Sequence, residues 1–219
     1  MDVILLAFIG SAAAGGMTAV GAAPMLVGRA PSDRAQDMLL GFSAGVMLSA
    51  SFFSLILPSV EAARSLYGGD VAAAAKAVKD AGVVVGVLAI AVCNELAPHR
   101  HFISGPEGPR DVALERIWLF VIAIAIHNFP EGMAVGVGFA GGDMGKATTL
   151  AIGIGLQNAP EGLAVAVALA SEGYSKGRSV LAAALTGVVE PIGGVAAAAA
   201  VTAAEWLLPW ALAFAAGAM

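Results

Sequence analysis

A short polar motif occurs twice in this sequence, each time in the middle of a strongly apolar segment. Residues 127–132 read His-Asn-Phe-Pro-Glu-Gly, and residues 157–162, which begin 30 positions later, read Gln-Asn-Ala-Pro-Glu-Gly. The apolar segments around them cover residues 117–140 and 150–170. A glutamate at the centre of a membrane helix is costly, so it needs a partner or a function. The two motifs therefore constrain the fold and the function together.

The spacing inside each motif places its polar side chains on one side of a helix. Residues four apart share a face, so His127 lies beside Glu131, and Gln157 lies beside Glu161. Each asparagine stands three residues before its glutamate, on an adjoining strip of that face. The proline cannot donate a backbone hydrogen bond, which predicts a kink and a freed carbonyl in each helix. Two such faces turned toward each other would gather carboxylates, amides and an imidazole, a collection typical of a metal site.

The composition is that of a membrane protein. The chain has 219 residues, of which 59% are hydrophobic and 12% charged, with a mean hydropathy of +0.87. Soluble domains carry roughly 25% charged residues. The net charge of −5 is small and says nothing useful about partners, and we expect no nucleic-acid partner. The single cysteine, Cys93, excludes a disulfide framework and a thiolate metal cluster.

Continuous apolar runs predict an all-α membrane protein, a polytopic helix bundle in one transmembrane domain. A membrane helix needs about 20 apolar residues, and a β-barrel would instead alternate with a period of two. Six runs are long enough, and a shorter seventh, at residues 206–219, predicts a partial helix. The six predicted full spans are residues 3–27, 38–60, 71–97, 117–140, 150–170 and 180–204.

The basic residues predict an orientation. Cytoplasmic connections are enriched in lysine and arginine. The first, third and fifth connections carry seven basic residues: Arg29, Arg34, Arg100, Arg110, Arg116, Lys176 and Arg178. The second and fourth carry four: Arg64, Lys76, Lys79 and Lys146. This bias predicts that the N-terminus lies outside. We expect the protein in the plasma membrane, which in a bacterium is the inner membrane.

The sixth apolar run contains a third glutamate beside a proline, Glu190. The runs that hold Glu131, Glu161 and Glu190 contain no lysine or arginine. Acids inside a membrane normally find a basic partner or a cation, so these glutamates are either protonated or neutralised by a cation. Carboxylates together with an imidazole suit divalent first-row metals and their heavier congeners. In the second run Met47 adds the one soft donor of a weakly polar strip.

Three functions remain open on these residues. The first is a transporter or selective channel for divalent metal ions. The second is an intramembrane metallohydrolase, which would require a His-Glu-x-x-His motif with two imidazoles, whereas only one histidine lies inside the predicted spans and it precedes Asn128. The third is a structural or sensor protein that holds a metal without moving it. The residues favour a transporter over an enzyme.

The two motifs resemble the paired signatures of the fourth and fifth helices of the ZIP (Zrt/Irt-like) divalent metal transporters, with the greatest likeness to bacterial members. The likeness extends through residues 37–42, 54–58 and 190–191, and so over nearly the whole chain. The resemblance implies an eight-helix bundle with a binuclear metal site in mid-membrane. It also implies inward transport of zinc, or of cadmium, iron or manganese, with the metal as substrate and no catalytic cofactor.

The resemblance also implies a ligand set for each ion. The implied ligands of the first ion are Met47, His127, Glu131, Gln157 and Glu161. Those of the second ion are Asn128, Glu131, Asn158, Glu161 and Glu190, with the two central glutamates shared.

Two features depart from the family pattern. Bacterial relatives often have an acid where this chain has the neutral Asn158, so we expect a weaker second position. The last apolar run has 14 residues, which at 1.5 Å each span about 21 Å of a hydrocarbon core of about 30 Å. We therefore expect a C-terminally truncated member of the family. The sequence leaves the oligomeric state open, a homodimer included.

Overall fold

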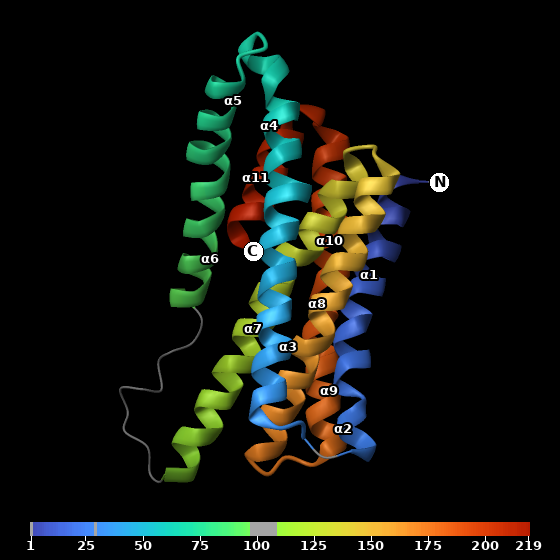
Figure 1. Cartoon of the computed structure of the whole chain (residues 1–219), viewed down its shortest axis with the longest axis vertical. Coiled ribbons are helices and arrows are strands. Elements are labelled where there is room, and N and C mark those ends of the chain that lie inside the picture. Colours follow the sequence, from blue (N-terminus) through green and yellow to red (C-terminus); the bar gives the residue numbers. More distant parts are fainter. Residues whose placement is uncertain (1, 29, 97–108) are drawn as a thin grey trace.

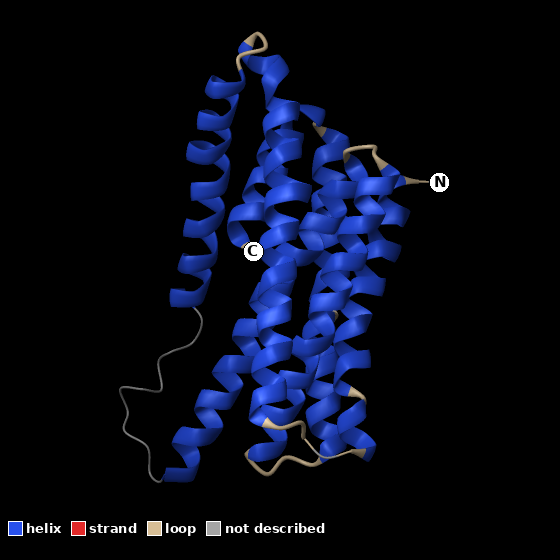
Figure 2. Ribbon diagram, viewed as in Figure 1, coloured by secondary structure: helices blue, strands red, loops and turns tan. Residues whose placement is uncertain are grey.

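The computed structural model describes residues 2–28, 30–96 and 109–219, and these residues form helices and turns without a strand (Figure 2). The α-helices are α1 (Val3–Ala22), α2 (Pro24–Val27), α3 (Asp33–Ser49), α4 (Leu57–Arg64), α5 (Val71–Ala77), α6 (Val84–Leu96), α7 (Pro109–Ala140), α8 (Met144–Ser171), α9 (Lys176–Gly187), α10 (Val189–Ala203) and α11 (Leu208–Ala218). The π-helical stretches η1 (Ala50–Ile56) and η3 (Val78–Val83) join α3 to α4 and α5 to α6. Two 3₁₀ turns, η2 (Ser65–Tyr67) and η5 (Glu205–Leu207), complete the set. The prediction of an all-α fold is confirmed.

Five helical stretches in the described part of the chain are long and apolar enough to cross a membrane. They are Val3–Val27, Asp33–Tyr67, Ile117–Ala140, Met144–Ser171 and Lys176–Ala203. These stretches match the first, second, fourth, fifth and sixth predicted spans, and the second, fifth and sixth are longer than predicted. The prediction of a polytopic membrane protein is confirmed.

The third predicted span behaves differently from the other five. It is helical through α5, η3 and α6, but its first half carries Lys76, Lys79 and Asp80. It is not among the five stretches above, and its last residue lies outside the described residues. A membrane crossing by this segment stays a prediction, as does the grouping of the whole chain into one domain. The predicted partial seventh helix corresponds to η5 and α11.

Short turns bring the two motif-bearing helices together. Residues 141–143 join α7 to α8, and Gly142 adopts the left-handed φ of 84° that this turn requires. Asp143 then caps α8, since its side chain accepts a hydrogen bond from the backbone N–H of Lys146 at 3.0 Å. Because the connection is so short, α7 and α8 pack side by side in opposite directions. The second motif therefore runs antiparallel to the first.

The bundle is built around two helix pairs, α1 with α8 and α7 with α10, which make its most extensive contacts. In Figure 1 these helices stand side by side with α3 and α9, while α5 and α6 lie at the edge of the bundle. The C-terminal helix α11 packs against η3, α6 and α7. The motif-bearing helices are thus enclosed by others.

A polar layer crosses the bundle between two apolar cores. Along α8 the buried residues are first apolar, at Leu150 and Ile154, and apolar again at Val165 and Leu169. Between these two groups lies the buried second motif, residues 157–162. The same sequence of apolar, polar and apolar residues occurs in α7. The motifs therefore lie near the middle of their helices, as the sequence predicts.

The outer surface of the bundle is apolar, as expected of helices that face lipid. Leu48 is 73% exposed and Ile192 is 61% exposed, and many other large apolar side chains are similarly uncovered. Near the turn between α8 and α9, Trp118 donates a hydrogen bond to the hydroxyl of Tyr174 at 2.7 Å. Tryptophan and tyrosine are common at membrane–water interfaces.

Candidate metal centre

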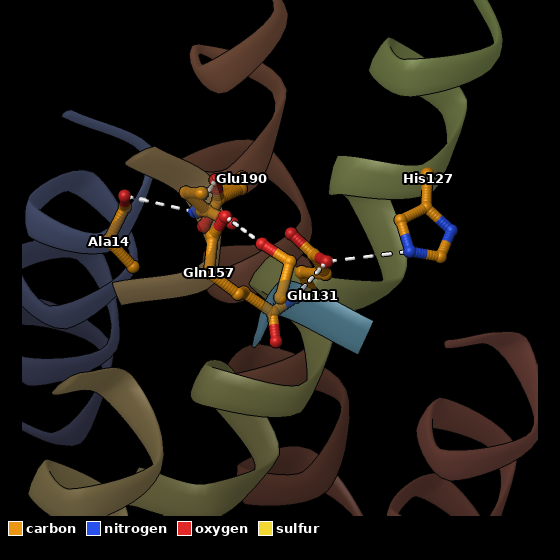
Figure 3. A network of polar contacts seen from close by, with 7 residues as sticks. Ala14, His127, Glu131, Gln157 and Glu190 are labelled. Atoms are coloured by element: carbon orange, nitrogen blue, oxygen red, sulfur yellow. Dashed lines mark hydrogen bonds and ion pairs between the residues drawn. The ribbon is translucent and has the colours of Figure 1, made fainter. Parts of the chain in front are cut away.

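The first motif places Glu131 at the centre of the polar layer. Its side chain is fully buried, and its Oε1 lies 3.5 Å from Nε2 of His127, one helical turn earlier on α7. The amide of Gln157, on α8, donates a hydrogen bond to the same oxygen. Figure 3 shows Glu131 between these two partners. Glu190 is likewise fully buried, and Glu161 is 7% exposed.

The second asparagine joins three helices. The Nδ2 of Asn158 on α8 donates to Glu190 Oε1 on α10 at 2.6 Å and to the backbone carbonyl of Ala14 on α1 at 3.0 Å (Figure 3). Asn158 and Glu190 are fully buried. The sequence alone placed Glu190 in the middle of a continuous run, whereas α9 ends at Gly187 and α10 begins at Val189. Glu190 therefore lies in the first turn of a new helix.

A cavity borders this polar layer. It has a volume of about 590 Å³ and lies between α3, α6, α7 and α8. Met47, His127 and Glu161 line it together, and Ser43 on α3 lines it as well. The thioether, the imidazole and one of the central carboxylates therefore share one space. Glu131 lies behind them.

The polar layer contains oxygens that have no hydrogen-bond partner. Among the described residues, seven buried side-chain atoms lack one: Thr18 Oγ1, Asn128 Oδ1, Glu131 Oε2, Gln157 Oε1, Asn158 Oδ1, Glu161 Oε2 and Glu190 Oε2. Six of the seven belong to residues that the sequence assigns to the metal site. A buried oxygen without a partner destabilises a protein by about 1–3 kcal/mol. Oxygens of this kind are the ligands that a divalent cation would satisfy.

The described residues contain no group of three or more His, Cys, Asp or Glu side chains arranged to hold a metal ion. Gln157 and Asn158 turn their nitrogens, not their oxygens, toward Glu131 and Glu190. An amide nitrogen has no lone pair free for a metal. Of the three buried carboxylates, those of Glu131 and Glu190 are thus bonded to amides.

Glycines in the motifs permit this close packing. A Cβ added at Gly132 would lie 2.0 Å from the backbone oxygen of Glu190, and one at Gly162 would lie 2.0 Å from that of Thr18. A Cβ at Gly15 would lie 2.2 Å from the Gly187 carbonyl oxygen and 3.2 Å from Glu190 Oε1. Backbones therefore touch on both sides of the centre, as is common where membrane helices pack through small residues.

Comparison with known proteins gives a consistent result. The family model for the ZIP zinc transporter matches residues 112–219. Over 211 residues the chain is 43% identical to the zinc transporter GufA of Myxococcus xanthus, an alignment that covers 96% of this chain and 82% of that protein. The chain belongs to the ZIP family. It is also 45% identical to the zinc transporter ZIPB of Bordetella bronchiseptica, over 97% of this chain and 68% of the relative.

Similarity within the ZIP family extends beyond bacteria. The human zinc transporter ZIP11 is 35% identical over an alignment that covers 99% of this chain and 86% of the relative. The resemblance that the two motifs carry is thereby confirmed. As a ZIP family member whose described residues include five helical stretches suited to crossing a bilayer, the protein is an integral membrane protein.

Sequence reasoning missed three contributions to this ZIP centre. Ser43 on α3 donates from its hydroxyl to the backbone oxygen of Gln157 at 2.6 Å. Ala14 and Thr18 bring α1 up to the polar layer. Ser43 and Thr18 are small polar residues in apolar runs, a weak signal. Ala14 contributes through its backbone carbonyl oxygen, and a backbone group leaves no signal in the sequence.

Proposed function

We propose that this protein carries divalent transition-metal ions, zinc foremost, across its membrane toward the cytoplasm. The observation that carries the proposal is the buried layer of carboxylate and amide oxygens without partners, in helices whose spans contain no basic side chain. A cation is the remaining means of neutralising such a layer besides protonation. The relatives that share its sequence are named zinc transporters, which favours transport over hydrolysis or sensing.

The first ion would be held where the cavity meets the polar layer. Its candidate ligands come from three helices: Met47, His127, Glu131, Gln157 and Glu161. Met47, His127 and Glu161 line the cavity. Behind them, Gln157 donates a hydrogen bond to Glu131, which also lies near His127. Such a set of imidazole, thioether and oxygen donors accepts Zn²⁺, and also Cd²⁺, Fe²⁺ or Mn²⁺. The metal is cargo here, not a cofactor.

A second ion at Asn128, Asn158 and Glu190, sharing Glu131 and Glu161, is a separate prediction. Asn158 offers this position a neutral carbonyl oxygen where an acid would add a charge, and charge count is a main determinant of affinity for a divalent cation. We therefore expect it to bind metal more weakly than the first position.

The cavity supports a direction of transport. It is lined by Leu40 and Phe120 as well as by the candidate ligands, and so lies on the side of the polar layer nearer the connection before Asp33 and the turn after Ser171. With the N-terminus outside the plasma membrane, as the basic residues predict, this side is cytoplasmic. The structure would then be open to the inside, one of the two states that alternating access requires.

The test is metal flux by the purified protein. Proteoliposomes that contain the full chain and a trapped zinc indicator should show zinc uptake that empty liposomes and denatured protein lack. Added Cd²⁺ should compete, whereas Mg²⁺ should not, because it prefers an octahedral shell of oxygens. Metal binding without flux would favour a structural or sensor protein instead.

A further inference from the structure

Helix α3 forms one wall of the cavity but has little contact with the rest of the bundle. It packs mainly against α8 (Figure 1). Ser43 is its one buried residue, whereas Met38, Phe42 and Leu48 are more than half exposed. The position of α3 therefore depends on a small contact surface around Ser43.

The continuation of the same helical stretch does not hold α3 in place. After Ser49 the chain passes through η1 into α4, and both of these pack against α11. The join is π-helical: the backbone N–H of Leu57 bonds to the carbonyl of Phe52, five residues earlier. Such irregular turns inside long helices are frequent at functional sites. Because α3 and α4 pack against different partners, α3 is positioned by its own contacts with α8.

One hydrogen bond joins α3 to α8. The hydroxyl of Ser43 donates to the backbone oxygen of Gln157 at 2.6 Å, and both residues are buried. In the described part of the chain it is the one side-chain hydrogen bond between α3 and another helix. The other side-chain bonds of α3 are local, from Gln36 to the Pro31 carbonyl and from Ser49 to the Gly45 carbonyl. Ser43 thus fixes α3 relative to the second motif.

Ser43 also lies one helical turn before Met47, on the same face of α3. Both side chains line the cavity, together with His127 and Glu161. Among the described residues that line this cavity, Met47 alone carries sulfur. The other candidate ligands lie on α7 and α8, which a short turn and the bond from Gln157 to Glu131 hold together. A displacement of α3 would therefore carry the thioether away from the other ligands and leave those in place.

We infer that Ser43 is a positioning residue for metal preference: its hydroxyl holds α3 against α8 and thereby keeps the Met47 thioether within reach of an ion bound by His127 and Glu161. The inference rests on the proposed function and deepens it, because it concerns which metals the same site prefers. A thioether is a soft ligand that suits Cd²⁺ better than Mn²⁺, which favours oxygen. Loss of the Ser43 bond should therefore weaken the binding of soft ions most.

The first experiment compares Cd²⁺ and Mn²⁺ affinities of the purified full chain by calorimetry. All proteins carry Cys93→Ser, since that exposed thiol would itself bind Cd²⁺. Ser43→Ala should weaken Cd²⁺ binding about tenfold and Mn²⁺ binding less than about threefold. Ser43→Thr keeps the hydroxyl and should restore the ratio of the two affinities. Equal losses for both metals, or a ratio that threonine does not restore, would overturn the inference.

Ser49→Ala is the matched control. It removes a hydroxyl from the same helix, but one whose bond stays within α3. The ratio of Cd²⁺ to Mn²⁺ affinity should stay at the wild-type value. A change in this ratio as large as that of Ser43→Ala would overturn the inference, because the effect would then not depend on the link to α8.

A double-mutant cycle tests whether Ser43 acts through Met47. Met47→Leu should lower Cd²⁺ affinity about tenfold, and the addition of Ser43→Ala should lower it no further. Independent effects would instead multiply to a loss of about 100-fold, which would overturn the inference.

X-ray absorption at the cadmium edge gives a direct readout of the same link. Bound Cd²⁺ should have a sulfur neighbour in the Cys93→Ser protein and in its Ser43→Thr variant. The Ser43→Ala and Met47→Leu variants should lack this neighbour. A sulfur neighbour that persists in Ser43→Ala would overturn the inference.

The outcomes separate this inference from the function on which it rests. If Met47→Leu leaves Cd²⁺ affinity unchanged while the protein moves zinc into proteoliposomes, the role of Ser43 fails and transport stands. If the affinity ratio responds to Ser43 as expected but no metal is moved, transport fails and the role of Ser43 stands. If the wild type binds no metal, both fail.

Discussion

The two motifs are nearly the same in sequence, but their helices run in opposite directions, so their residues face the cavity in opposite order. In α7 the first residue, His127, lines the cavity, while Glu131 is buried behind it. In α8 the order is reversed: Glu161 lines the cavity, while Gln157 is buried and reaches Glu131. The cause is the short turn that makes the helices antiparallel. The repeated motif thus supplies candidate ligands at two levels. The cavity level holds His127 and Glu161, and the deeper level holds Glu131 and Gln157.

The two motifs also differ in what holds their asparagines. Asn128 and Asn158 are both buried with an unpaired oxygen. Asn158 is additionally bonded to α1 and α10. The comparison shows that identical positions in a repeat can have different hydrogen-bond partners, depending on which helices pack against each copy.

The largest expected effect comes from the deeper level. Glu131→Gln should reduce metal flux by roughly 100-fold or more, since it removes a fully buried charge that contacts both motifs and lies at the centre of the ligand set. Glu161→Gln should follow closely. Zinc uptake into proteoliposomes measures both, with Glu205→Gln, the same change at an exposed site, as the matched control. Uptake within twofold of wild type for either variant would contradict the proposed centre.

The cavity level should control metal preference instead. His127→Ala leaves oxygens and one thioether, so binding of Zn²⁺ and Cd²⁺ should weaken about tenfold more than binding of Mn²⁺, which favours oxygen ligands. Competition calorimetry on the purified protein would measure this ratio. Equal losses for all three metals would mean that the imidazole does not select among them, and the cavity level would then be a passage only.

The glycines of the two motifs should matter equally for stability. Gly132→Ala and Gly162→Ala each push a methyl group against a backbone oxygen of a neighbouring helix, and overpacking of this kind costs about 1–3 kcal/mol. Each should lower the melting temperature by roughly 5 °C. Gly16→Ala is the control, since a Cβ there would meet nothing within 4 Å. An unchanged melting temperature in one of the two would show that the motifs are braced unequally.

The smallest effect should come from the link between α3 and the second motif. Ser43→Ala removes the bond to the backbone oxygen of Gln157, which should lower stability by about 1 kcal/mol. Ser49→Ala is a suitable control, because its hydroxyl bonds only within its own helix, to Gly45. Thermal unfolding in detergent should separate the two. If they melt alike, α3 is held by its apolar contacts alone.

Much of the fold follows from local features of the sequence. Continuous apolar runs such as residues 117–140 give membrane helices because only a helix satisfies its own backbone in lipid. The centre could be found in the same way, since acids such as Glu131 and Glu161 in uncharged spans have few physical explanations. Residues 71–97 were harder, because Lys76, Lys79 and Asp80 occupy the start of an otherwise apolar run.

The sequence by itself determined which helices form, that they suit a membrane, and that residues 127–131 and 157–161 present polar faces at mid-length. These are properties of chemical type and helical period, and neither depends on the neighbours. The tertiary structure alone decided that Gln157 meets Glu131, that Glu161 and not Gln157 faces the cavity, and that the α1 backbone holds Asn158. Those outcomes depend on the direction and closeness of helix packing. A backbone carbonyl such as that of Ala14 has the same chemistry in every residue, so its partner cannot be known until the helices are in place.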